Sequence, residues 1–126
     1  MSQDPFNSLR AYGLSWTAIS LCNQVYGYSD HNDESDACRH FVWAALLVNS
    51  LGKDFANRIL NAHEDEPEQP ESERRMDLAN NLKGLEAADR IIRKGKMESS
   101  ALVEEFKRQL HDHKLIVLEP RIESKE

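Results

Sequence analysis

The sequence Asp36-Ala-Cys-Arg-His-Phe-Val-Trp-Ala-Ala-Leu-Leu-Val48 begins with ionisable residues and ends as the most apolar run of the chain. A helix that is apolar on every side is normally surrounded by other helices, so we expect this one at the centre of the fold. Its first turns nevertheless carry Asp36, Arg39 and His40, of which Asp36 and His40 share one helix face. Burying ionisable groups costs free energy unless they find partners, so the rest of the chain should supply those partners.

Four further helices are predicted around this central helix from apolar residues that recur at helical spacing. Tyr12 and Trp16 of the first helix are interpreted as core residues. Leu78, Leu82 and Leu85 form an apolar stripe on the fourth helix. Glycines after three of the helices, and prolines in the acidic loop after the third, are expected to end them. Asp33 is the expected N-cap of the central helix. The predicted helices, with the central one second, span residues 5–27, 34–51, 53–63, 72–94 and 98–110.

The carboxyl-terminal residues do not continue the helical pattern. Residues 115–118, Leu-Ile-Val-Leu, are interpreted as an extended segment that either closes the core or pairs with a partner. Residues 119–126 are expected to be a charged, flexible tail. The sequence therefore predicts an all-α fold, a single domain over residues 1–118 with about five helices around a central apolar helix and a short extended carboxyl-terminal segment.

Composition limits the classes of function. The 126 residues fit one domain, and the net charge of −6 argues against broad nucleic-acid or membrane-surface binding. No apolar run reaches the roughly 20 residues of a membrane span. The amino terminus lacks a secretory signal, so the cytoplasm is the expected location, with signal-free export left open. Cys22 and Cys38 match no metal or redox motif and are interpreted as two buried thiols, although a disulfide remains an alternative.

Three groups of polar side chains lie on or at the ends of consecutive helices, where the fold itself does not require them. Because short links favour contact between consecutive helices, we expect the three groups to converge on one pocket. The groups are Asp36, Arg39 and His40; His63 and Glu64; and Asp77, Asn80 and Asn81.

Metal-assisted hydrolysis is one chemistry that such a set could perform. His40, His63 and Asp77, with Asp36, are candidate ligands for a divalent metal such as zinc or manganese, which would lower the pKa of a bound water. The order of these groups resembles the His … His-Asp … Asp signature of all-helical phosphohydrolases. Glu64 stands where that signature has Asp, and Asp77 comes earlier than usual.

Metal-free acid–base catalysis is the alternative chemistry. Glu64 or Asp77 in an apolar pocket would act as acid or base with His40, and two carboxylates across a cleft would suit glycoside cleavage. In either chemistry Arg39 is a candidate clamp for an anionic substrate. Further candidate substrate-binding residues are Trp43, Asn80 and Asn81.

The same residues resemble a bacterial family of uncharacterised small α-helical domains, some of them in toxin-like proteins. The family pattern reads Asp-x-x-Arg-His-Ala-x-Trp-Asn, then Ala-His-Glu, then Met-Asp-Leu-x-Asn-Asn-x-x-Gly. This chain follows it over about residues 36–84 and departs from it at Phe41 and Ala44. The resemblance implies that the matching positions form one site, without naming a reaction.

We therefore expect a small bacterial hydrolase with a small-molecule or envelope-derived substrate. An antagonistic effector that acts on the cell envelope or on a phosphoester would fit the resemblance. The alternative is a non-catalytic helical adaptor, in which the polar groups only fix the packing. In that case residues 115–118 or the acidic loop would bind a protein partner.

Overall fold

The computed structural model describes residues 5–64 and 68–120, and over these ranges the fold is all-α, as the sequence predicts. The helix bounds agree with the predicted bounds to within about one residue, because glycines and helix caps mark most of the ends. No described residue lies in a β-strand. The five helices are α1 (Pro5–Tyr26), α2 (Glu34–Leu51), α3 (Lys53–His63), α4 (Glu71–Lys94) and α5 (Ser99–His111).

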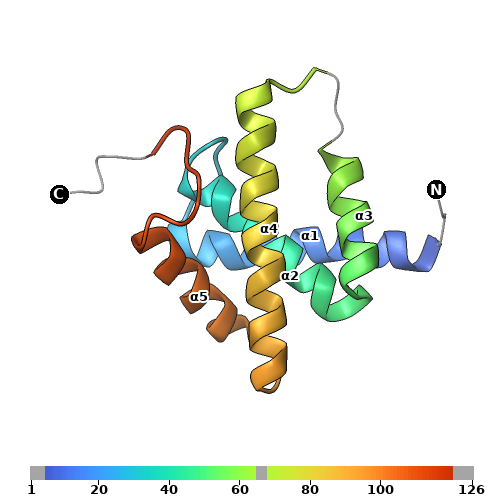
Figure 1. The fold of residues 1–126 in the computed structure, drawn as a ribbon. Coiled ribbons are helices and arrows are strands. Elements are labelled where there is room, and N and C mark those ends of the chain that lie inside the picture. The colour runs from blue at the N-terminus through green and yellow to red at the C-terminus, as the bar shows by residue number, and fades with distance from the viewer. Residues whose placement is uncertain (1–4, 65–67, 121–126) are drawn as a thin grey trace.

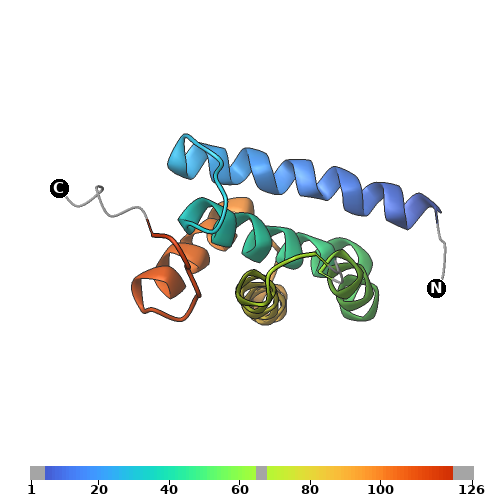
Figure 2. The same ribbon diagram turned by 90° about the horizontal axis from the view of Figure 1, so that it is seen from above.

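Helix α2 is the centre of the molecule and contacts each of the other four helices. As Figure 2 shows, α1 lies along one side of α2, and α4 lies on the opposite side, seen nearly end-on. In Figure 1, α4 crosses α2 with α3 and α5 on either side of it. The predicted central position of the apolar helix is therefore confirmed. Its fully buried side chains include Phe41, Val42, Ala44, Ala45 and Leu47.

The contact between α2 and α4 depends on a glycine. A Cβ atom at Gly84 would collide with the carbonyl oxygen of Phe41 and lie 3.0 Å from the Cβ of Ala44. Only glycine allows the two helices to approach this closely, and this approach directs the polar residues of α4 toward α2. Of the predicted apolar stripe, Leu85 is buried at 5% exposure whereas Leu82 is 52% exposed, so α4 buries this stripe only in part.

Helix α1 packs on α2 through small side chains and a disulfide. Ala11 and Ala18 are buried, and Cys22 is bonded to Cys38 of α2, with their Cα atoms 6.0 Å apart. The interpretation of the two cysteines as thiols is therefore wrong in this structure, because side-by-side packing brings them within bridging distance. The interpretation of Tyr12 and Trp16 as core residues is also wrong, since they are 61% and 57% exposed.

The residues after α5 close the core without forming a strand. Leu115 is buried against the core of α1, α2, α4 and α5, while Ile116 is 41% exposed. The Asn80 amide holds the backbone of Ile116 through two hydrogen bonds of 2.9 Å, and the Glu119 N–H donates to the Asn32 carbonyl. Most of the predicted tail, residues 121–126, lies outside the described residues. None of the described helices combines the length and apolarity needed to cross a membrane.

Candidate active site

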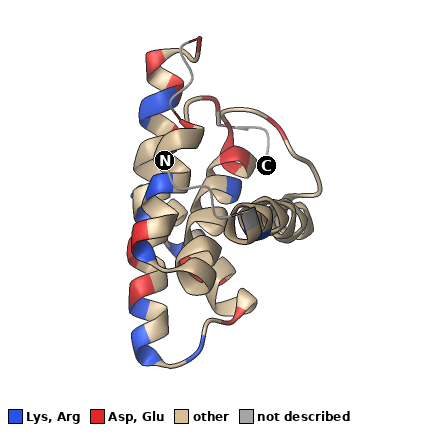
Figure 3. Ribbon diagram, turned by 90° about the vertical axis from the view of Figure 1, so that its right-hand side faces the viewer, with Lys and Arg blue, Asp and Glu red and all other residues tan. Residues whose placement is uncertain are grey.

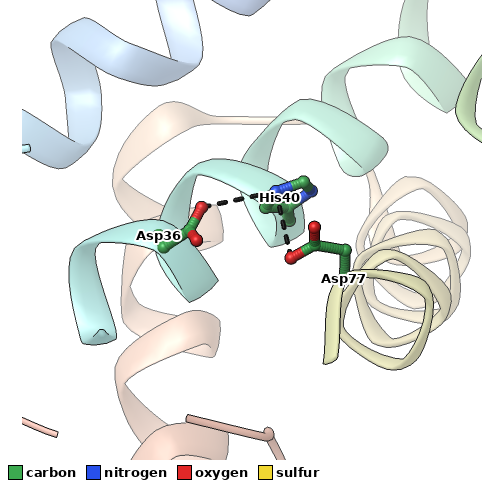
Figure 4. Close-up of side chains that lie close together, drawn as sticks. All are labelled: Asp36, His40 and Asp77. Carbon is green, nitrogen blue, oxygen red and sulfur yellow. Dashed lines mark ion pairs between the residues drawn. The ribbon is translucent and has the colours of Figure 1, made fainter. Parts of the chain in front are cut away.

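His40 lies at the centre of the candidate site, surrounded by carboxylates from α2, from α4 and from Glu64, the residue directly after α3. Its Nε2 atom is 3.3 Å from Asp36 Oδ1 and 3.3 Å from Asp77 Oδ1, as Figure 4 shows. Its Nδ1 atom is 3.6 Å from Glu64 Oε2 and 3.3 Å from Asn81 Oδ1. The structure therefore brings five of the expected residues together around one imidazole.

The start of α2 fixes the position of Asp36. The side chain of Asp33 caps the helix by accepting hydrogen bonds from the N–H groups of Ser35 and Asp36, as the sequence leads us to expect of an N-cap residue. Asp36 Oδ2 accepts a 2.7 Å hydrogen bond from the Asn32 N–H, at a residue whose φ is +65°. Asp36 is thus held rigidly, with its Oδ1 atom directed at His40.

Arg39 ties this helix to the loop that precedes it. Its guanidinium donates to the Ser29 hydroxyl at 2.7 Å, to the Asp30 carbonyl and to Asp36 Oδ1 at 3.0 Å. The side chain lines the pocket around His40, but both of its terminal nitrogens already bind the protein. In this arrangement Arg39 positions Asp36, and its expected role as an anion clamp stays a prediction.

Asp77 and Asn81 carry buried polar atoms that the fold leaves without hydrogen bonds. Asp77 Oδ2 accepts a 3.0 Å hydrogen bond from Gln69, whereas Asp77 Oδ1 has no hydrogen-bond partner although the residue is 4% exposed. The amide nitrogen of Asn81 is also buried without a partner. Such atoms are rare inside proteins because each costs free energy, and they mark a place where a ligand can bind.

The charges around His40 shift its pKa and that of Asp36 in opposite directions. Burial favours neutral His40, but the hydrogen bond to Asp36 and the negative charges of Asp77, Asp36 and Glu64 raise the pKa of His40. Burial favours protonated Asp36, but the hydrogen bond and the charge of His40, a backbone N–H and the charge of Arg39 lower its pKa. His40 and Asp36 therefore stabilise each other as an ion pair.

The pKa values of the two remaining carboxylates, Asp77 and Glu64, shift in opposite directions. Burial raises the pKa of Asp77 to about 6, and the negative charges of Glu64 and Asp36 add to the rise while His40 opposes it. Burial also acts to raise the pKa of Glu64, but hydrogen bonding to His63 and the charge of His40 lower it. A single imidazole thus faces three carboxylates, and Asp77 is the one whose charged form is least favoured.

Two cavities meet at His40. The first, which we call the acidic pocket, measures about 830 Å³. The second, which we call the apolar groove, measures about 370 Å³ and runs between α1 and Trp43. Arg39, His40 and His63 line both cavities. The acidic pocket also contains His31, Asp36, Glu64, Glu73 and Asp77, and the apolar groove contains Tyr12, Ser15, Ala18, Ile19 and Trp43.

Three of the expected site residues lie outside the cluster around His40. The His63 side chain is 58% exposed at the rim, 3.4 Å from Glu64 Oε2, with its ring 5.2 Å from that of Trp43. The indole N–H of Trp43 donates to the Ala11 carbonyl, which holds the ring as one wall of the apolar groove. Asn80 is fully buried and binds the Ile116 backbone instead of facing a pocket.

Sequence reasoning does not single out His31, Gln69 and Glu73, which line the acidic pocket. His31 lies 3.2 Å from Glu73 and 3.7 Å from Asp36, and Gln69 binds Asp77. They come from irregular segments or from the exposed start of α4, where hydrophobic periodicity carries no information. The sequence does offer one signal for two of them. The loop that contains His31 directly precedes α2, the loop that contains Gln69 directly precedes α4, and both helices carry site residues.

Asp36, His40 and Asp77 form the described group best placed to hold a metal ion, with one ligand atom of each within 4.8 Å of the others. A charge-assisted N–H···O bond measures about 2.7–2.9 Å. Two ligand atoms around a tetrahedral zinc ion lie roughly 3.3–3.5 Å apart. The observed 3.3 Å separations from His40 to both carboxylates fit the second case better.

A family model described as a domain of unknown function, DUF6973, matches residues 1–114 of the chain. Searches of curated proteins and of solved structures give no match. The family match covers every residue of the candidate site.

Proposed function

The chain belongs to the DUF6973 family, and we propose that it is a metal-assisted hydrolase whose centre is Asp36, His40 and Asp77. The observation that carries the proposal is the buried Asp77 Oδ1 atom, which faces His40 at 3.3 Å and has no hydrogen-bond partner. A divalent cation bound there would offset the burial and the neighbouring negative charges that raise the pKa of Asp77. Zinc and manganese both accept a set of one imidazole and two carboxylates.

The remaining residues support a hydrolytic reaction. A cation held by Asp36, His40 and Asp77 would lower the pKa of a nearby water molecule and polarise the group under attack. Glu64, whose Oε2 atom is 3.6 Å from His40 Nδ1, would act as the general base for the attacking water. The water oxygen then bonds to the carbonyl carbon or the phosphorus, and the bond to the leaving oxygen breaks. The leaving oxygen receives the proton that Glu64 took.

An exported protein fits this structure better than a cytoplasmic one. The Cys22–Cys38 disulfide is almost fully buried and links the two helices that form the apolar groove. Disulfides persist in oxidising compartments and are rare in the cytosol. We therefore favour export, with an envelope-derived ester or phosphoester as substrate. A bacterial antagonistic role remains a prediction from the resemblance.

Elemental analysis and calorimetric titration test the metal site directly. The purified protein should bind one zinc or manganese ion per chain, and a chelator should lower its melting temperature. Asp77→Asn should weaken binding by about tenfold or more, because a neutral amide replaces an anionic ligand. The matched control is His111→Ala, since the His111 side chain is 89% exposed and lies away from the site.

Hydrolysis of a nitrophenyl ester and of a nitrophenyl phosphodiester tests the chemistry. Glu64→Gln should lose about a hundredfold or more in kcat while it keeps the metal, as expected for a general base. If the protein binds no metal and Glu64→Gln changes no rate, the hydrolase proposal fails. The adaptor alternative then gains support, because Arg39 and Asn80 already have structural partners.

A further inference from the structure

Helix α1 presents a row of large apolar side chains to solvent. Leu9, Tyr12 and Trp16 are 69%, 61% and 57% exposed, and their spacing places them on one helix face. We call these three residues the α1 stripe. Figure 2 shows α1 as the outermost layer on its side of α2, so no other described helix covers this side. Exposed apolar patches on a folded domain usually mark a binding surface.

The α1 stripe continues into the apolar groove, because Tyr12 belongs to both. Beyond Tyr12 the groove is lined by further α1 residues, among them Ser15 and Ile19, and by Trp43. It reaches His40 and His63, where it meets the acidic pocket. When the stripe is bound to a surface, an apolar chain that leaves that surface can therefore enter the groove directly. The polar end of the chain then lies at His40.

The low content of charged residues in α1 suits a lipid surface better than the charge content of the rest of the chain does. Its 22 residues include a single charged side chain, Arg10, whereas 30% of all residues in the chain are charged. Figure 3, which looks along α1, shows this helix almost wholly tan beside the red and blue bands of α4. A helix without carboxylates is not repelled by lipid phosphates. Trp and Tyr side chains favour the boundary between water and hydrocarbon.

We propose that the α1 stripe docks on a phospholipid surface and that the substrate is a phospholipid whose acyl chain occupies the apolar groove. This inference rests on the proposed hydrolase function, because it assigns the substrate of the same site. The continuity of the stripe with the groove favours lipid over a protein partner or a second copy, neither of which needs a path to His40.

Co-sedimentation with vesicles of phosphatidylcholine and phosphatidylglycerol tests the docking surface without reference to activity. The wild-type protein should bind, and the double variant Leu9→Ser, Trp16→Ser should bind at least about tenfold more weakly. Leu82→Ser is the matched control, because Leu82 is 52% exposed on α4, and it should bind like the wild type. Equal binding by all three proteins, or a wild-type dimer that the double variant dissociates, would overturn the proposal.

The chain-length preference of hydrolysis tests the groove. Ser15→Trp, in a groove residue of α1, should fill the groove and lower kcat/KM for long-chain phospholipids by about tenfold or more. On a short, water-soluble nitrophenyl ester the same variant should lose several-fold less kcat/KM, because that substrate has no long chain to fill the groove. An equal loss on both substrates would contradict the assignment of the groove to the acyl chain.

The two assays separate failure of the substrate class from failure of the chemistry. Vesicle binding without hydrolysis of any ester or phosphoester refutes the hydrolase proposal and the phospholipid substrate, while the docking surface stands. Hydrolysis of water-soluble esters without vesicle binding refutes the lipid surface and leaves the metal-assisted centre intact. Mass spectrometry of the products shows which phospholipid bond is cleaved, the acyl ester or the phosphoester.

Discussion

Helices α1 and α4 pack on opposite sides of α2, and they depart from ordinary amphipathic packing in opposite ways. Helix α4 buries Asp77, Asn80 and Asn81 and exposes Leu82. Helix α1 turns small residues toward α2 and exposes Tyr12 and Trp16. An amphipathic helix that only stabilised the core would do the reverse in both cases.

Both helices depart from ordinary packing at faces that adjoin the candidate site. The polar face of α4 places Asp77 and Asn81 against His40, and Gly84 allows the two helices to approach closely enough for this contact. The apolar face of α1 lies beside the groove that leads to the same histidine. The buried polar face of α4 and the groove beside the exposed apolar face of α1 therefore both reach His40.

The largest effect should come from adding one methyl group to α4. Gly84→Ala places a Cβ atom against the Phe41 carbonyl, which belongs to the backbone of α2, so the helices must separate. We expect a loss of about 3 kcal/mol or more in the free energy of unfolding, measured by urea denaturation. The control is Gly13→Ala on α1, where nothing lies within 4 Å, and a gain of about 1 kcal/mol is expected.

The disulfide that attaches α1 should have the next largest effect. The double variant Cys22→Ser, Cys38→Ser removes a link across 16 residues and should lower the free energy of unfolding by about 3 kcal/mol. Dithiothreitol should destabilise the wild-type protein to a similar extent and leave the variant unchanged. Two titratable thiols in the unreduced wild-type protein would contradict the prediction.

Neighbouring asparagines on α4 should respond differently to truncation. Asn80→Ala removes both hydrogen bonds to the Ile116 backbone and should cost about 2 kcal/mol of stability, measured by urea denaturation. Asn81→Ala removes one long contact with His40 together with a buried amide nitrogen that has no hydrogen-bond partner. Its cost in stability should therefore stay below about 1 kcal/mol. The prediction is wrong if Asn81→Ala is the more destabilising change.

The smallest effect should be a gain in stability. In metal-free buffer Asp77→Asn removes a buried carboxylate that repels Glu64 and Asp36, so the free energy of unfolding should stay constant or rise by up to about 1 kcal/mol. Asp89→Asn on the exposed side of α4 is the control. It breaks a surface ion pair with Arg93 and should change stability by less than about 0.5 kcal/mol. A clear loss of stability in Asp77→Asn would indicate a structural role.

Much of the fold could be predicted because its signals are local. Gly27, Gly52 and Gly95 mark helix ends, and Asp33 forms the expected cap. The central apolar helix and the convergence on His40 of polar residues from α2, α3 and α4 also follow from periodicity and short connections. These features depend on residues near one another in the sequence.

The features that could not be predicted depend on which face of a helix meets its neighbour. Helical spacing groups Tyr12 with Trp16 but does not say whether their side faces α2 or solvent. The disulfide requires the relative shift of α1 and α2, which the 16-residue separation leaves open. For the same reason the adjacent asparagines were indistinguishable: Asn80 binds the carboxyl-terminal segment, whereas Asn81 faces His40.

The segment after α5 has a consequence for anyone who trims or tags this domain. Residues 115–119 bridge Asn80 on α4 and Asn32, whose N–H holds Asp36. A version cut after residue 114 would keep all five helices and look intact by circular dichroism, yet it would lose the contacts that support the loop behind Asp36. An affinity handle is therefore better placed ahead of α1 than after residue 119.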